Sequence, residues 1–358
     1  LIIRKLHHDE IKLKQRGYYL GIKIAIQVSA EPSDEEIAFV KQLGLQWVTS
    51  WAFGEKANYE TYVKARRRLE SAGLKLWSIG NGNVHNMEEV TLNLPGRDKK
   101  IEEYKKYLHD IGKAGIHYTT YAHMGNGIWS TEPEETRGGA LARAFDASKA
   151  KEGRWIAKRF VGPLTHGRVY TEDEIWENFE YFIKQVVPVA EKYDIKIGIH
   201  PDDPPIEHES IPPGYTSLNK FRKLLDAVNS QNVGLVFCVG TFAEAGEDIY
   251  GALELLMKER KVFHVHLRNI KYNLPKHKCY DEVMIDEGDI NLIRILKILK
   301  DNDYEGTINP DHVPIYHYNN NDELRSPTCW NLNDKRCREG YLYTIGYIKG
   351  IIAALNDS

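Results

Sequence analysis

The sequence predicts an α/β protein, a single (β/α)8 TIM barrel over residues 1–358. Short apolar segments rich in β-branched residues alternate with longer amphipathic segments along the chain. This alternation indicates a parallel sheet, because each helical crossover returns the chain to the same end of the sheet. A count of eight pairs favours a closed barrel over an open doubly wound sheet. No Gly-x-Gly-x-x-Gly motif follows an early strand, which argues against a dinucleotide fold.

The expected strands are short segments in which apolar and β-branched residues dominate. They span residues 23–29, 47–52, 75–81, 117–124, 196–200, 233–239, 262–270 and 306–312.

The expected helices carry start and stop signals. Ser33 and Thr171 are suited to cap helices that open with acidic residues, and Gly73 and Gly115 are suited to end two others. Pro188 should kink the helix that contains it. The expected helices span residues 32–44, 58–73, 97–115, 171–194, 217–229, 247–260, 290–303 and 341–355.

Two stretches interrupt the regular spacing. Residues 125–170, after the fourth strand, form a long insertion, and a loop of that length in a compact domain is typically a lid or a substrate-binding wall. Residues 313–338, after the eighth strand, are expected to form an irregular loop.

Composition excludes several classes of partner. A formal net charge of −3 without a basic stripe argues against nucleic acid, and no apolar stretch reaches the roughly 18 residues that a membrane span needs. Four cysteines are too sparse for a disulfide framework, so a reducing, cytoplasmic location is expected. The chain begins at Leu1, so removal of a leader remains open. A small-molecule substrate is the expected partner, and a homo-oligomer is possible.

Metal-capable residues stand at the ends of the last four strands, where a barrel of this kind places its active site. Taken singly, a strand histidine is usually a core residue and a cysteine a small buried one. Four such residues at the same end instead predict a site for Mn, Fe, Co or Zn. His264 points to the same side as His266, but His266 lies nearer the strand end. The predicted ligands are His200, Cys238, His266 and Asp311.

The motifs around these residues resemble those of mannonate dehydratases, metal-dependent sugar-acid dehydratases whose barrel is related to that of the xylose isomerases. The motifs are IGIHPDDPP (197–205), VFCVGT (236–241), HVHLRNI (264–270) and INPDHVP (308–314). The resemblance implies a hydro-lyase that converts D-mannonate, or a related aldonic or uronic acid, to a 2-keto-3-deoxy product such as 2-keto-3-deoxy-D-gluconate. It implies the same four metal ligands, with Mn as the expected metal, and makes His312 the catalytic histidine.

Further roles are expected from chemistry and position. A second proton carrier is needed, and Tyr341 is the first candidate, ahead of Tyr316 and His123. One of Asp202 and Asp203 is expected to hold the ring N–H of a ligand or catalytic histidine, unless both only close the turn. The residues expected to bind the substrate are Arg268, Asn269, His85, Arg137 and His123.

The chain also departs from the family pattern. Val313 and Pro314 follow the Asp-His pair where the family has Gly-Arg, and the segment EGYLYTIGYIKG (339–350) is a loose match to the one that carries the family's catalytic tyrosine. Two alternatives therefore stay open. One is a metal-dependent sugar isomerase or epimerase of the same barrel superfamily, and the other is a barrel that binds carbohydrate without catalysis.

Overall fold

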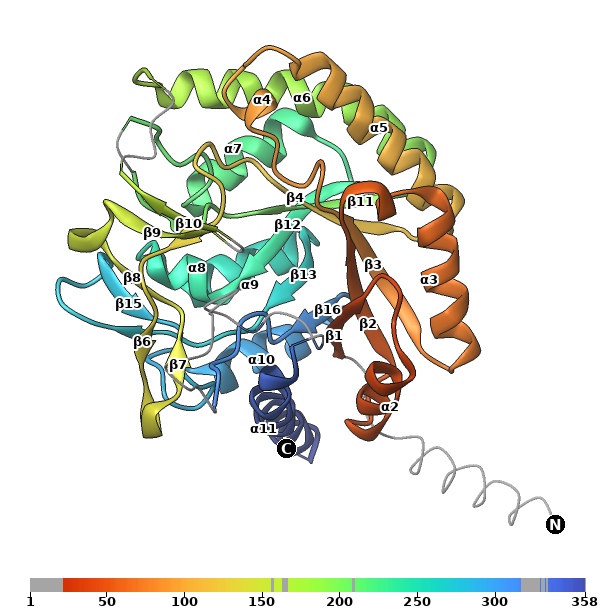
Figure 1. Ribbon diagram of the computed structural model, residues 1–358, viewed down its shortest axis with the longest axis vertical. Helices are drawn as coiled ribbons and strands as arrows, with labels where there is room; N and C mark the ends of the chain where they lie inside the picture. The colour runs from red at the N-terminus through yellow and green to blue at the C-terminus, as the bar shows by residue number, and fades with distance from the viewer. Residues whose placement is uncertain are drawn as a thin grey trace.

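The structure of the chain is a computed structural model that describes residues 22–155, 158–162, 167–207, 210–316, 329, 332 and 334–357. A barrel of parallel strands lies at its centre and helices surround it (Figure 1). The barrel strands are β1 (Lys23–Ser29), β2 (Trp47–Ala52), β3 (Lys75–Asn81), β4 (Tyr118–Ala122), β11 (Lys196–His200), β12 (Val233–Cys238), β13 (Val262–His266) and β16 (Thr307–Asn309).

The order of these strands confirms the predicted barrel. The hydrogen-bonded sheet runs β3-β2-β1-β16-β13-β12-β11-β4, so the first and last barrel strands are neighbours. The remaining seam lies between β3 and β4. There the Ala122 amide donates to the His85 carbonyl at 2.9 Å, and Asn86 forms a parallel bridge with Ala122.

The helices follow the expected alternation (Figure 1). Ser33 and Thr171 both form capping boxes, and α6 continues through Pro188 as one helix. The α-helices are α2 (Asp34–Gln42), α3 (Tyr59–Ser71), α4 (Glu88–Thr91), α5 (Arg97–Lys113), α6 (Glu172–Lys192), α7 (Leu218–Val228), α8 (Val239–Glu244), α9 (Ile249–Lys258), α10 (Leu292–Asp301) and α11 (Arg338–Asp357). Short 3-10 turns are η1 (Gly54–Lys56), η2 (Arg137–Gly139), η3 (Ala147–Lys149) and η4 (Lys335–Cys337).

The hydrophobic core lies between the strands and the helices around them. Every residue of β12 is buried, as expected for a parallel strand that is covered on both faces. Among the described residues, no helix is long and apolar enough to cross a membrane.

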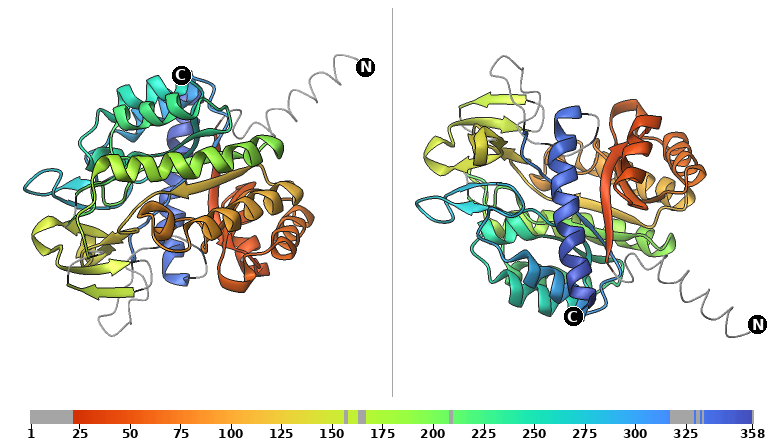
Figure 2. Two further views of the ribbon diagram at one scale, coloured as in Figure 1. Left: turned by 90° about the horizontal axis from the view of Figure 1, so that it is seen from above. Right: turned by 90° about the horizontal axis from the view of Figure 1, so that it is seen from below.

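The insertion after β4 is built from short antiparallel strands. These are β5 (Trp129–Ser130), β6 (Glu134–Glu135), β7 (Leu141–Ala142), β8 (Ala144–Asp146), β9 (Glu152–Trp155) and β10 (Lys158–Val161). Strand β8 pairs with β15 (Cys279–Asp281), which pairs in turn with β14 (Lys271–Tyr272). Figure 2 shows the insertion and the β14–β15 hairpin together on one side of the molecule. The insertion is thus joined to the segment after β13 by a shared sheet.

Strand-like contacts hold the described residues that follow β16. Val313 pairs with Cys329, and Ile315 pairs with Leu141 of the insertion. Cys329 and Cys337 form a disulfide across eight residues, although cysteine spacing predicted no disulfide framework. Residues 317–328, within the loop predicted at 313–338, lie outside the described part of the chain.

Candidate metal centre

Three of the four predicted ligands form one cluster at the carboxyl ends of adjacent strands. One donor atom each from His200, Cys238 and His266 lies within 4.8 Å of the others. The sheet register explains this, since Cys238 pairs directly with His266 across β12 and β13. The Asp311 carboxylate joins them, with its Oδ2 atom 3.5 Å from Nδ1 of His266. The strand ends thus bring three predicted ligands together, with Asp311 beside one of them.

A left-handed turn brings Asp311 and His312 to the same side. Adjacent residues of a strand would point to opposite faces, but β16 ends at Asn309, and Asp311 has a φ of 61°. The Asn309 side chain accepts the Asp311 amide at 2.9 Å, which stabilises the turn. As a result, Nε2 of His312 lies 3.7 Å from Oδ1 of Asp311.

Hydrogen bonds orient the donor atoms of two of these residues. The His200 Nδ1–H donates to the Pro201 carbonyl at 2.6 Å, and its Nε2 faces Nδ1 of His266 at 3.2 Å. Such a hydrogen bond on the outer nitrogen fixes the orientation of the ring. Burial opposes protonation of His200, but Cys238, Asp203 and Asp311 raise its pKa to about 9, so a metal bound at Nε2 would displace a proton. The Thr241 hydroxyl donates to the Cys238 sulfur at 3.1 Å.

Charge at the site favours the anionic ligands. Burial opposes ionisation of the Cys238 thiol, yet the Arg268 guanidinium and hydrogen bonds from His200 and His266 hold its pKa well below the ordinary value. Burial likewise opposes ionisation of Asp311, but the neighbouring cations keep its pKa well below its usual range. Two imidazoles, a thiolate and a carboxylate match the ligand chemistry of a divalent transition metal.

His264 stays outside the ligand set, as predicted. Its Nδ1 lies 2.8 Å from the Thr307 hydroxyl, and it is buried on β13 two residues before the ligand His266. Burial and the neighbouring His266 hold its pKa well below the ordinary value.

Arg268 is committed to carboxylates of the protein. Its side chain is 1% exposed and lies within 3.3 Å of Asp203 and Asp311 and at 2.8 Å from Glu282, and it also pairs with Glu244. Because its guanidinium is surrounded by these groups, Arg268 holds the ligand Asp311 in place, and the sequence-based role of binding the substrate carboxylate is not supported by this geometry.

His312 has a carboxylate partner that the sequence did not reveal. Its Nδ1 lies 2.6 Å from Oε2 of Glu282. Burial opposes protonation of the ring, but Asp311 and Glu282 raise the pKa of His312 above its ordinary value. Glu282 is itself ion-paired with Arg143 and Arg268, which hold its pKa well below the usual range in spite of burial.

One of Asp202 and Asp203 was expected to accept a hydrogen bond from the ring N–H of a histidine. In the structure both carboxylates bind other groups. Asp202 accepts the Tyr215 amide at 2.7 Å and closes the turn. Asp203 pairs with Arg143 at 2.9 Å and with Arg268 at 3.3 Å. The ring N–H groups of His200 and His312 donate to the Pro201 carbonyl and to Glu282 instead, so this prediction is corrected.

Two more predicted residues have structural contacts. The Asn269 side chain forms hydrogen bonds with main-chain atoms of Ile270, Ile285 and Ile290. His123 is buried among Thr91, Tyr121 and the Ile175 carbonyl, and burial lowers its pKa to about 3. The structure therefore gives Asn269 and His123 the environment of structural residues.

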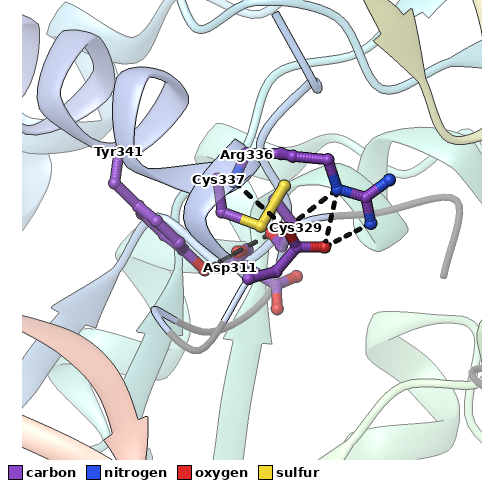
Figure 3. The surroundings of a disulfide bond; sticks show 6 residues. Asp311, Cys329, Arg336, Cys337 and Tyr341 are labelled. Carbon is purple, nitrogen blue, oxygen red and sulfur yellow. Dashed lines mark hydrogen bonds and ion pairs between the residues drawn. A yellow bond between two sulfur atoms is a disulfide. The ribbon is translucent and has the colours of Figure 1, made fainter. Parts of the chain in front are cut away.

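Tyr341 is also buried. Its hydroxyl donates to the carbonyls of Asp311 at 3.2 Å and Cys329 at 3.3 Å, beside the Cys329–Cys337 disulfide (Figure 3). This contact fixes the loop that carries the ligand Asp311. Burial raises the pKa of Tyr341 well above its ordinary value, which disfavours the predicted role as a proton carrier.

His85 lies near the predicted metal ligands, whereas Arg137 lies away from them. His85 packs edge-on against Trp51 with ring centroids 4.5 Å apart, and its carbonyl accepts the amide of Ala122, the residue that pairs with His200 across β4 and β11. Burial lowers its pKa to about 4. Arg137 is half-exposed and pairs with Asp286 at 2.9 Å, so it lies on the outer surface of the insertion.

Comparison with known proteins gives one consistent family. The model of the D-mannonate dehydratase (UxuA) family matches residues 37–358. A mannonate dehydratase of Thermotoga maritima is 30% identical over 286 residues, which cover 72% of this chain and 78% of that protein. One of Streptococcus equi subsp. zooepidemicus is 29% identical over 288 residues, which cover 72% of this chain and 75% of that protein.

Solved structures agree on the fold. The crystal structure of mannonate dehydratase from Streptococcus suis serotype 2 superposes with a TM-score of 0.77 at 23% identity and covers 94% of this chain and 93% of that one. A D-psicose 3-epimerase from Clostridium cellulolyticum H10 has a TM-score of 0.59 at 14% identity, with coverages of 92% and 99%. Since the family model matches nearly the whole chain and the relatives agree with it, the chain belongs to the D-mannonate dehydratase family.

Proposed function

We propose that this chain is a metal-dependent hydro-lyase that dehydrates a sugar acid, D-mannonate or a close aldonic or uronic relative. The observation that carries the proposal is the arrangement at the strand ends. Two imidazoles, a thiolate and a carboxylate converge there, and His312 lies beside them with its ring held by Glu282. Membership of the family supports the same reaction class.

The reaction removes one molecule of water. A base takes the proton from the carbon next to the carboxylate, and an acid supplies a proton to the hydroxyl of the following carbon, which leaves as water. The resulting enol rearranges to a 2-keto-3-deoxy acid, so no oxidant or reductant is needed.

The residues of the site match these demands. His200, Cys238, His266 and Asp311 would hold a divalent metal, which supplies Lewis acidity that stabilises the negative charge formed next to the substrate carboxylate. His312 is placed to move a proton, because an imidazole titrates near neutral pH and its Nε2 faces the ligand Asp311. We propose Mn as the metal, with Fe, Co or Zn as alternatives.

The two alternative functions have less support. The isomerases and epimerases of this superfamily resemble the chain in fold alone, at 14% identity for the psicose epimerase, and they typically bind metal without a cysteine. Loss of catalysis is disfavoured because His312 retains both a carboxylate partner and its place beside the ligands.

A substrate panel tests the proposal. The protein is loaded with Mn and incubated with aldonic and uronic acids, and the 2-keto-3-deoxy product is measured. We expect product from D-mannonate or a close relative, and a loss of about 10²–10⁴-fold in turnover for His312→Asn at unchanged metal content. Turnover of a ketose into its epimer, with no dehydration of any acid, would overturn the proposal.

A further inference from the structure

We propose that Glu282 is a positioning residue for proton transfer, that it acts by fixing the ring of His312, and that Arg143 of the insertion holds Glu282 in place for this role. The inference rests on the proposed function, because it assigns His312 the proton transfer of the dehydration.

The contact between Glu282 and His312 fixes the ring by its chemistry. Oε2 of Glu282 lies 2.6 Å from Nδ1 of His312, and the side chain of Glu282 is 2% exposed. An ionised carboxylate only accepts hydrogen bonds, so Nδ1 must carry the hydrogen. The other ring nitrogen, Nε2, then points toward Asp311. The pair thus selects both the tautomer and the direction of the nitrogen that meets the substrate.

Glu282 divides its two oxygens between two tasks. Oε1 pairs with Arg143 and lies 2.8 Å from Arg268, whereas Oε2 binds His312. The two guanidinium groups keep the carboxylate ionised in a buried place, where an isolated charge would be very unfavourable. The second oxygen is therefore available to orient the histidine.

Arg143 holds Glu282 through the main chain as well. The Glu282 amide donates to the Arg143 carbonyl at 2.8 Å, at the point where β8 pairs with β15. The Arg143 guanidinium also donates to the Trp129 carbonyl at 2.6 Å and to Asp203 at 2.9 Å. The insertion thereby contacts His312 indirectly, through the buried pair of Arg143 and Glu282, in addition to any function as a lid.

The neighbouring Asp281 provides a matched control. It is the last residue of β15 and directly precedes Glu282, but its carboxylate accepts a hydrogen bond from Asn273 at 2.8 Å. A change at this position removes one carboxylate from β15 without touching His312.

The experiment compares Glu282→Gln, Glu282→Asp and Asp281→Asn in metal-loaded protein. We expect the two Glu282 variants to lower kcat for D-mannonate by about 10–100-fold, the usual effect of losing such an outer partner, with KM and metal content close to those of the parent. The melting temperature should stay close to that of the parent in Glu282→Asp and fall in Glu282→Gln, which removes the charge that faces two buried guanidinium groups. Glu282→Asp keeps the charge and the ion pairs but shortens the reach to His312, so it remains informative if Glu282→Gln does not fold. Asp281→Asn should behave as the parent.

A double variant separates positioning from structure. If Glu282 acts through His312, adding Glu282→Gln to His312→Asn should leave the remaining kcat unchanged. A further loss in the double variant, or parental kcat in both Glu282 variants, would overturn the inference while leaving the proposed function standing.

A readout without substrate makes the two proposals independent. In zinc-loaded protein with ¹⁵N-labelled histidine, we expect a strongly deshielded Nδ1 proton that disappears in His312→Asn and shifts upfield in Glu282→Asp. If the parent dehydrates no acid but this signal is present, the proposed function fails and the positioning contact stands. Absence of the signal overturns the inference whatever the activity.

Discussion

Tyr341→Phe distinguishes two roles for a residue that the family resemblance and the structure describe differently. The change removes one hydroxyl, which in the structure donates to the carbonyls of Asp311 and Cys329 at 3.2 and 3.3 Å in a fully buried place. Leaving these carbonyls without their donor should cost about 2 kcal/mol of the free energy of unfolding.

The expected shift in melting temperature follows from the chain length. An unfolding entropy of about 2.1 cal/mol/K per residue gives about 0.75 kcal/mol/K for 358 residues. A loss of about 2 kcal/mol therefore lowers the melting temperature by about 3 °C. Because the hydroxyl is engaged with main-chain carbonyls, kcat per metal-loaded molecule should stay within about threefold of the parent.

The assay measures melting temperature, metal content and kcat for D-mannonate on one preparation. Tyr343→Phe is the matched control, since Tyr343 lies on the same helix α11 but is 39% exposed. We expect a change within about 0.5 kcal/mol for this control. A loss of about 10²-fold in kcat for Tyr341→Phe, with metal content and melting temperature unchanged, would refute the structural role and make Tyr341 a proton carrier.

Three further changes test other parts of the molecule. Cys238→Ser should strongly lower metal content in elemental analysis, because a hydroxyl replaces a thiolate ligand, whereas the half-buried Cys279→Ser should leave it unchanged. His123 has a pKa of about 3 against an ordinary 6.5, through burial. The unfolded chain thus takes up a proton below pH 6.5 and the folded one does not, so His123 lowers the free energy of unfolding by about 2 kcal/mol between pH 7.5 and 5. Between pH 7.5 and 5, the free energy of unfolding measured with urea should therefore fall by about 2 kcal/mol less in His123→Gln than in the parent. An equal fall in the two proteins would argue against a buried neutral ring at His123. Cys337→Ser opens a loop of eight residues and should cost about 2.5 kcal/mol of stability, with a parental melting curve arguing that the disulfide does not form.

The barrel and its ligands could be predicted because their signals are local. The apolar residues of each barrel strand predict that strand without reference to the rest of the chain. The predicted and observed strands differ only at their ends. The segment 262–270, for example, stops being a strand at His266, where the chain leaves the sheet to build the site. Once parallel strands were expected, His200 and Cys238 needed no pairing information, because all strand ends meet at one face.

The carboxylate partner of His312 could not be predicted in this way. Glu282 and Arg143 are 139 residues apart, and they meet because β15 of one loop pairs with β8 of another. Pairing between two segments so far apart in the chain leaves no local signal in the sequence. The acidic sequence around Glu282 also resembles that of an ordinary solvent-exposed loop. The role assigned to Tyr341 differed for a similar reason, since burial of its hydroxyl depends on the loop that carries Cys329.

The left-handed backbone at Asp311 limits how this site can be redesigned. Among residues with side chains, asparagine and aspartate enter that region with little steric cost, while bulkier ones are penalised by about 1 kcal/mol or more. Glutamate or cysteine at position 311 would therefore meet a backbone penalty as well as a new side-chain length. His200 and Cys238 lie at the ends of regular strands, with no such restriction on φ. Attempts to change the metal preference of the protein should begin at those two positions.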